Sequence, residues 1–147
     1  MKVKDLLQEK GREIITIGAD SSIVEASSKM VQRNVGALLV EGEGGRLVGL
    51  ITERDIVKIL SKTECELKDL TVKDIMVKSE NLLVAEPEDE IEYVMAVMIQ
   101  NAVRHIPIVE KGDLTGIISI RDVVKTHVRK LKAEIHFLKE YISDKYA

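Results

Sequence analysis

Apolar and polar positions in the first half of the chain predict alternating strands and helices. Ile23, Ala26 and Met30 recur at helical spacing behind Asp20-Ser21-Ser22, which predicts an amphipathic helix capped by Ser22. Apolar runs without that spacing predict strands. The predicted elements are, in order, a strand at 13–17, a helix from Ile23 ended by Asn34-Val35-Gly36, a hairpin of strands at 37–40 and 46–51 around a glycine-rich turn at 42–45, and a helix from Thr52 to Leu60.

The second half of the chain repeats the first. Gly49-Leu50-Ile51-Thr52-Glu53-Arg54-Asp55 matches Gly116-Ile117-Ile118-Ser119-Ile120-Arg121-Asp122, and Lys4-Asp5-Leu6-Leu7 matches Lys73-Asp74-Ile75-Met76. The repeat covers about residues 3–60 and 72–125. Its second copy predicts a strand at 82–85, a helix at about 89–100 after Pro87, strands at 105–109 and 114–118 around a turn at 111–113, and a helix opened by Ser119.

This duplicated β-α-β-β-α order predicts an α/β protein of the α+β type. We expect a first domain at residues 1–62, a linker at 63–71, a second domain at 72–127 and a C-terminal helix at 128–147. One repeat of about 55 residues is too small to bury both faces of its sheet. The two copies are therefore expected to pack on each other.

The C-terminal helix carries a heptad pattern. Its apolar residues are spaced 4, 3, 4, 3 and 4 positions apart, which is typical of a coiled-coil seam. Glu134 and Lys139 fall at the g and e positions, where a parallel pair of helices forms ion pairs. We favour an intersubunit contact, the alternative being that this face packs back on its own module. The seam residues are Val124, Val128, Leu131, Ile135, Leu138 and Ile142.

Composition narrows the class of protein. The formal net charge of −3 argues against a protein that lives on nucleic acid, and an aromatic content of 3% removes stacking platforms for single strands. The lone Cys65 cannot form an internal disulfide, which fits a reducing cytoplasm. No apolar run approaches the roughly 20 residues that span a bilayer. We expect a soluble cytoplasmic protein.

The two strand-to-helix junctions carry the candidate chemistry. Thr52 with Asp55, and Ser119 with Asp122, form helix caps that need no ligand. The same geometry can bind one, because free N–H groups at a helix N-terminus donate to a phosphate while the carboxylate accepts from ribose hydroxyls. No catalytic constellation or P-loop accompanies them, and His105, His127, His136 and Cys65 lack metal-ligand spacing. We therefore expect neither an enzyme nor a metal site, and no cofactor.

With these motifs in place, the chain resembles a tandem pair of CBS domains, known as a Bateman module. The two Gly-to-Asp stretches carry the resemblance, together with Val103-Arg104-His105-Ile106-Pro107-Ile108-Val109 and the paired starts at Lys4 and Lys73. The first copy departs from the pattern, since Val35-Gly36-Ala37-Leu38-Leu39-Val40 replaces the Arg-His-Ile-Pro run and Ala19 replaces Pro87. Two unequal sites are the expected consequence.

The resemblance implies a stand-alone binding module with a pseudo-twofold pair of repeats and two clefts, often assembled as a homodimer. Such clefts commonly hold AMP, ADP, ATP or S-adenosylmethionine, and the output would act on a separate effector protein. The alternative is a ligand-free dimerisation scaffold whose junctions are only caps. The ligand-binding residues that the resemblance implies are Thr16, Ile17, Gly36, Ala37, Thr52, Arg54, Asp55, Arg104, His105, Ile106, Pro107, Ser119, Arg121 and Asp122.

Overall fold

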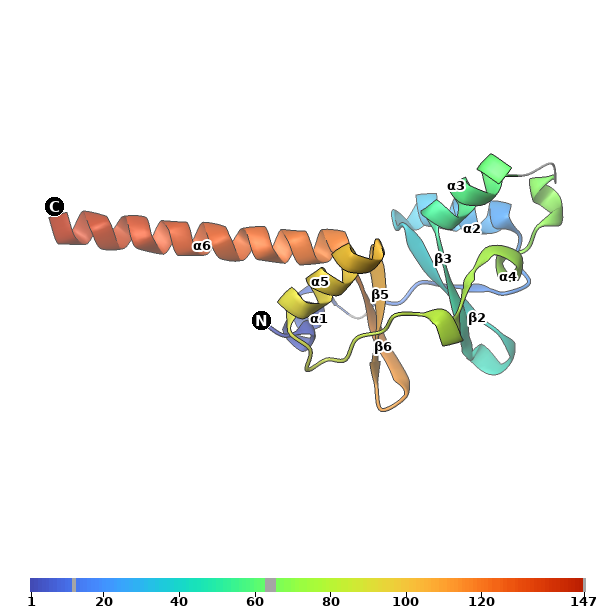
Figure 1. Ribbon diagram of the computed structural model, residues 1–147, viewed down its shortest axis with the longest axis horizontal. Helices are drawn as coiled ribbons and strands as arrows, with labels where there is room; N and C mark the ends of the chain where they lie inside the picture. The colour runs from blue at the N-terminus through green and yellow to red at the C-terminus, as the bar shows by residue number, and fades with distance from the viewer. Residues whose placement is uncertain (12, 63–65, 147) are drawn as a thin grey trace. The chain divides into compact units, whose positions relative to one another are not determined.

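The computed structural model describes residues 1–11, 13–62 and 66–146, and the chain divides into two compact units (Figure 1). The first unit is Glu13–Leu83, and the second unit joins Met1–Arg12 to Val84–Ala147. Both units mix strands and helices, so the predicted α+β class is confirmed.

The first unit is built around a four-stranded sheet in the order β1-β2-β3-β4. β1 runs parallel to β2, while β3 is antiparallel to both of its neighbours. The core contains Ile23, Ala26 and Met30, the residues whose spacing predicted the helix α2. The elements of this unit are β1 (Thr16–Gly18), α2 (Ile23–Arg33), β2 (Ala37–Glu41), β3 (Leu47–Thr52), α3 (Glu53–Lys62), α4 (Val72–Ile75) and β4 (Val77–Lys78).

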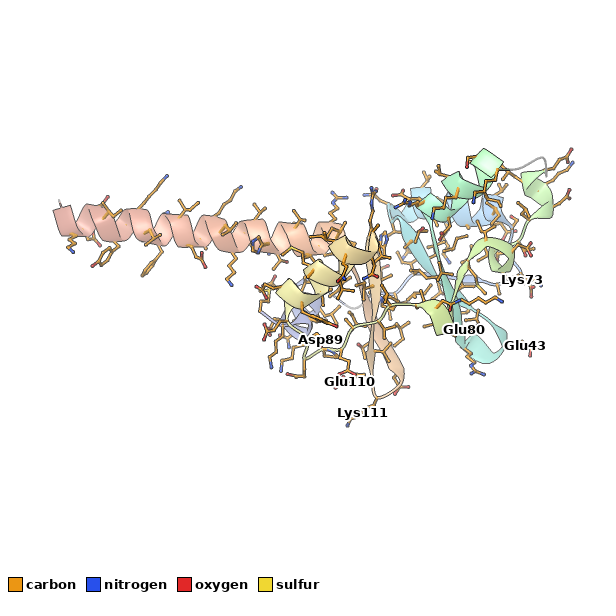
Figure 2. The ribbon with its side chains drawn as sticks, in the orientation of Figure 1. Glu43, Lys73, Glu80, Asp89, Glu110 and Lys111 are labelled. Atoms are coloured by element: carbon orange, nitrogen blue, oxygen red, sulfur yellow. The ribbon has the colours of Figure 1, made fainter. Side chains whose placement is uncertain are left out.

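The second unit packs helices against the hairpin β5–β6. Lys111 and Gly112 form its two-residue turn with φ of 52° and 82°, as a type I′ turn requires, and Lys111 lies at the tip of the hairpin (Figure 2). The last helix continues without interruption to residue 146, as the heptad pattern predicted. The elements are α1 (Val3–Lys10), α5 (Ile91–Asn101), β5 (His105–Glu110), β6 (Asp113–Ser119) and α6 (Ile120–Tyr146).

The leading helix of the first repeat belongs to the second unit. Val3 N–H donates to the carbonyl of Asp89 at 2.9 Å, and Lys4 N–H donates to the carbonyl of Pro87 at 2.9 Å. The Lys4 ammonium also pairs with Glu88 at 2.8 Å. Val3, Leu6 and Leu7 are buried in the core of this unit.

The leading helix of the second repeat makes the matching contacts in the first unit. Val72 N–H donates to the carbonyl of Ser21 at 2.8 Å, and Lys73 N–H donates to the carbonyl of Ala19 at 3.0 Å. The Lys73 ammonium (Figure 2) pairs with Asp20 at 2.7 Å. Each compact unit therefore contains the leading helix of the other repeat, and the units do not coincide with the sequence repeats.

The strand predicted at 82–85 is wrong, because only Ala85 pairs, in a single parallel bridge to Ile108. In the first unit, Leu39 N–H donates to the carbonyl of Ile15 at 3.1 Å ahead of β1. The matching donor in the second unit would be Pro107, which has no N–H. The proline therefore removes the bond that would extend this strand. The strand predicted at 13–17 is also shifted, since β1 starts at Thr16.

Several local predictions are confirmed by backbone geometry. Ser22 caps α2 by accepting from the N–H of Glu25 at 3.0 Å, and Asn34 ends that helix in the left-handed region at φ 53°. The glycine-rich turn contains Gly44 at φ 70°. The strand β4, by contrast, was not predicted, because its two residues, Val77 and Lys78, are too few to show the alternation of a strand.

Candidate ligand-binding junctions

The first junction joins β3 to α3 through Thr52 and Asp55. The N–H and the hydroxyl of Thr52 both donate to Asp55 Oδ2 at 2.9 Å, and Asp55 N–H donates back to Thr52 Oγ1 at 3.3 Å. Both bonds to the carboxylate use the same oxygen. Since an ionised carboxylate has about four acceptor positions on two oxygens, Asp55 keeps acceptor capacity for a ligand.

The second junction joins β6 to α6 in the same way. Ser119 N–H donates to Asp122 Oδ2 at 2.9 Å, and Asp122 N–H donates to Ser119 Oγ at 3.1 Å. The hydroxyl and carboxylate predicted from the duplicated motif are therefore brought together in both copies. Each carboxylate lies in the first turn of a helix of at least ten residues, where the helix dipole favours an anion.

Neighbouring strands bring further predicted residues to each junction. Ala37 pairs with Thr52 across the sheet, and the carbonyl of Gly36 accepts from the N–H of Glu53 at 3.0 Å. Thr16 starts the parallel strand β1 and therefore lies toward the same end of the sheet. These positions form one edge of the first unit, with Thr16 half-buried and Ile17 buried just behind it.

The second unit shows the equivalent arrangement with different side chains. His105 pairs with Ser119 across the hairpin, and the carbonyl of Arg104 accepts from the N–H of Ile120 at 2.7 Å. Arg104 is exposed and His105 is half-buried, whereas Ile106 and Pro107 are buried in β5. The exposed arginine of this junction has Gly36 as its counterpart, so the two junctions differ in side chains as the sequence predicted.

The two arginines of the duplicated motif, Arg54 and Arg121, lie in the first turns of α3 and α6. Both are exposed to solvent. An exposed guanidinium next to a helix N-terminus can meet a phosphate with two parallel hydrogen bonds. Both arginines are therefore accessible for the predicted contact with a phosphate.

One residue that sequence reasoning missed makes the two junctions electrostatically different. Lys10, at the end of α1, donates to Asp122 Oδ2 at 2.6 Å and to the carbonyl of Ile117 at 2.7 Å. Partial burial raises the pKa of Asp122, but hydrogen bonds from Lys10 and Ser119 outweigh it, and the pKa lies below the ordinary aspartate value. No spacing signal could have found Lys10, because it approaches Asp122 only through the docking of α1 on the second unit.

An open hollow of about 490 Å³ lies beside α2 in the first unit. Of the predicted site residues, Ile17 lines it, whereas Thr52 and Asp55 do not. Its two cations already have partners, because Lys29 donates to the carbonyl of Thr16 and Arg33 pairs with Glu13. The hollow is therefore a feature apart from the first junction.

The described residues contain neither a candidate metal-binding cluster nor a helix that could cross a membrane. Within residues 1–11, 13–62 and 66–146, no three His, Cys, Asp or Glu side chains gather where they could hold a metal ion. None of the helices in these ranges is both long and apolar enough to cross a membrane. Cys65 lies outside the described residues.

Comparison with known proteins identifies the class that this duplicated fold defines. The CBS domain model matches residues 3–62 and 72–128. A mitochondrial CBS domain-containing protein of Arabidopsis thaliana, CBSX3, is 33% identical over 150 residues, which cover 98% of this chain and 73% of the relative. The chain belongs to the CBS-domain family and carries two such domains in tandem.

Solved structures agree with this assignment. The CBS-domain protein ATU1752 of Agrobacterium tumefaciens is 37% identical with a TM-score of 0.81, covering 86% of this chain and 92% of that one. The CBS domain pair of protein MJ0100, solved with 5′-methylthioadenosine and S-adenosyl-L-methionine, is 27% identical with a TM-score of 0.75, covering 88% of this chain and 98% of that one. CBS-domain pairs of this kind are regulatory ligand-binding modules.

Proposed function

We propose that this protein senses adenosine-containing ligands, namely AMP, ADP, ATP or S-adenosylmethionine, at its two junctions. The observation that carries the proposal is the duplicated pair of a hydroxyl and a carboxylate at a helix N-terminus, Thr52 with Asp55 and Ser119 with Asp122. The carboxylate would accept from the two ribose hydroxyls, while the hydroxyl and the first helical turn would meet a phosphate or carboxylate. The adenosine derivatives bound to the similar MJ0100 pair support this ligand class.

The proposed output is a conformational change that a separate protein detects. α6 begins directly after Ser119 and runs for 27 residues, so it links the second junction to an exposed helical surface. Binding at the junction would favour one position of this helix, and a partner that contacts the helix would respond to the shift in population. The proposal has no chemical step, and it places the protein in the cytoplasm, where a single cysteine stays reduced.

A second candidate function is a ligand-free dimerisation scaffold. The capping bonds at both junctions are complete without a ligand, and a cap alone stabilises a protein by about 0.5–2 kcal/mol. The two functions differ in what the carboxylates do, so the same substitutions separate them.

Isothermal titration with AMP, ATP and S-adenosylmethionine tests the proposal. Asp55→Asn and Asp122→Asn are each expected to weaken binding about tenfold or more, because a charge-assisted acceptor of the ribose hydroxyls is lost. Asp74→Asn is the matched control. Asp74 accepts from the N–H and hydroxyl of Thr71 at 2.8 and 2.9 Å, the same cap outside either junction.

The scaffold predicts a different result. All three aspartate variants would then lose stability alike, and none of the three ligands would release heat at millimolar concentration with the unmodified protein. Together, these two results would rule out the sensing function. Loss of affinity in Asp55→Asn and Asp122→Asn but not in Asp74→Asn would rule out the ligand-free scaffold.

A further inference from the structure

The C-terminal part of α6 presents an apolar seam that its own unit does not cover. Figure 1 shows α6 extending beyond the rest of the second unit, and every residue from Val128 to Lys145 is exposed. At the start of this segment, Arg129 pairs with Glu9 of α1 at 3.6 Å. The seam residues beyond Val124 are 43% to 57% exposed, namely Val128, Leu131, Ile135, Leu138 and Ile142.

The identities of the seam residues indicate a coiled coil of two helices. The a positions are Val128, Ile135 and Ile142, all β-branched, and the d positions are Leu131 and Leu138. β-branched residues at a with leucine at d favour parallel two-stranded coiled coils over trimers and tetramers. A second copy of the chain presents the same seam, so it is a matching partner for each position.

The charges beside the seam select the parallel orientation. In a parallel pair, Glu134 at g lies next to Lys139 at e of the other helix. In an antiparallel pair, e positions face e positions, and these are Lys125, Lys132 and Lys139. Like charges would then face each other along the seam. Charge complementarity therefore favours the parallel arrangement.

The second unit also stabilises the start of α6 before any contact with another chain. Val123, in the first turn of α6, is completely buried in the core, so the module itself holds the start of the helix. Nucleation is the unfavourable step of helix formation, and here it does not have to accompany association. A seam of about two heptads, too short to associate readily as a free peptide, is thereby presented as a formed helix.

We propose that residues 128–146 form a parallel two-stranded coiled coil with the same segment of a second copy of this chain. The contact is isologous, and its twofold axis runs along the paired helices. It holds the two copies with α6 pointing in the same direction. This assignment does not depend on which ligand the junctions bind.

Cysteine cross-linking tests the proposal in the full chain with Cys65→Ser as background. Leu131→Cys and Leu138→Cys each place a thiol at d, where a parallel pair brings the two chains within the Cα separation of about 4.4–6.8 Å that a disulfide needs. We expect both variants to form covalent dimers under mild oxidation. Only the parallel, in-register pairing brings both positions, one heptad apart, next to their own counterparts.

Ala133→Cys and Glu140→Cys are the matched controls. They are also one heptad apart but occupy f positions on the outer face, so they are expected to remain uncross-linked. Equal cross-linking at d and f positions would overturn the proposal, as would the absence of dimers at 131 and 138. In an antiparallel pair, a positions face d positions, so cross-linking only in a mixture of Leu131→Cys and Ile135→Cys chains would establish an antiparallel pair and overturn the orientation.

Charge reversal gives a second, independent readout. Glu134→Lys in the Leu138→Cys chain is expected to slow cross-linking severalfold, because it places two lysines together in the parallel pair. Adding Lys139→Glu restores the pair with its signs exchanged and should restore the rate. A double variant as slow as the single one would contradict the parallel register.

Discussion

The ammonium of Lys10 lies 2.6 Å from the carboxylate of Asp122, although the two residues are 112 positions apart in the chain. Lys10 ends the leading helix of the first repeat, and Asp122 belongs to the duplicated motif of the second repeat. Within the described part of the chain, Asp55 has no ion pair of this kind. In addition to Arg104 in place of Gly36, the second junction therefore carries the positive charge of Lys10, which the first junction lacks.

We predict that Lys10→Gln changes ligand preference at the second junction. Lys10 makes this junction more favourable for an anionic ligand, so the variant should bind ATP roughly 3- to 10-fold more weakly, the effect of one nearby unit charge in a largely aqueous setting. S-adenosylmethionine, which carries a sulfonium cation, should lose less affinity. Isothermal titration of both ligands measures the difference.

Lys4→Gln is the control for this change. Lys4 also lies on α1 and also pairs with a carboxylate, Glu88, but outside the junction. It should leave both affinities unchanged. If Lys4→Gln weakened ATP binding as much as Lys10→Gln, the effect would come from the docking of α1 and not from the charge beside Asp122.

The same ion pair makes stability depend on pH. Because the pKa of Asp122 is lowered in the folded protein, its contribution is fully present above the pKa of an unfolded aspartate and is lost as pH falls through the folded value. Lys10→Gln should therefore lower the free energy of unfolding at pH 7 and show a shallower loss of stability in acid. Urea unfolding measures the free energy of unfolding of both proteins at pH 7 and near pH 3. The difference in this free energy between the two proteins should be smaller near pH 3.

A second acid-sensitive contact continues to act in both proteins. Hydrogen bonds from Lys2 and Lys4 lower the pKa of Glu88 to about 2, so both proteins should also lose the contribution of Glu88 as pH falls from the ordinary glutamate range toward about 2. A constant difference between Lys10→Gln and the unmodified chain at both pH values would show that the Lys10–Asp122 contact does not set the pKa of Asp122.

Local sequence signals predicted the junctions well, because each depends on residues three positions apart. The capping bonds of Thr52 with Asp55 and of Ser119 with Asp122 follow directly from the spacing in the motif. The seam of α6 was also predicted, since its period is local. In each case the interacting or recurring residues are only three or four positions apart in the sequence, so the pattern could be recognised without the structure.

Contacts between distant segments were not predictable in the same way. The bonds from the leading helices to the loops of the other repeat, such as Lys4 N–H to Pro87, join residues with no shared local pattern. The lost strand at 82–85 depends on Pro107, more than 20 positions away. The effect of that proline is predictable only once the pairing of Leu39 with Ile15 in the first unit is known.

The two glycines that start the duplicated motif are predicted to differ in tolerance of a side chain. A Cβ at Gly49 would lie 2.5 Å from the carbonyl oxygen of Val77, whereas a Cβ at Gly116 would lie 2.8 Å from the end of the Leu7 side chain. Backbone cannot move aside as easily as a leucine methyl group. Gly49→Ala should therefore lower the free energy of unfolding by about 1–3 kcal/mol, and Gly116→Ala by less.

Urea unfolding of the two alanine variants makes this comparison directly. Because both positions lie within strands and neither has a positive φ, the difference reports close approach and not backbone strain. Equal losses, or a larger loss at Gly116, would show that β4 can shift away from Gly49 at little cost.

The ends of α2 and α5 give a prediction of increased stability. Both helices end with a residue in the left-handed region, Asn34 at φ 53° and Ala102 at φ 53°. Alanine is strained there by its Cβ, whereas asparagine tolerates this conformation. Ala102 is exposed, so a larger side chain meets no packed neighbours. Ala102→Asn should raise the free energy of unfolding by about 0.5–1 kcal/mol and the melting temperature by a few degrees.

The reciprocal substitution is the matched control for this cap. Asn34→Ala copies the second repeat into the first and should lower stability by a similar amount, because it places the strained residue at a position with the same backbone bonds. At both helix ends, the cap N–H donates to carbonyls three and four residues back, such as those of Met98 and Ile99 for Ala102. Thermal unfolding of both variants, followed by calorimetry, should show shifts of opposite sign. Shifts of the same sign would mean that helix propensity or solvation, and not the left-handed backbone, decides which residue is preferred at these two ends.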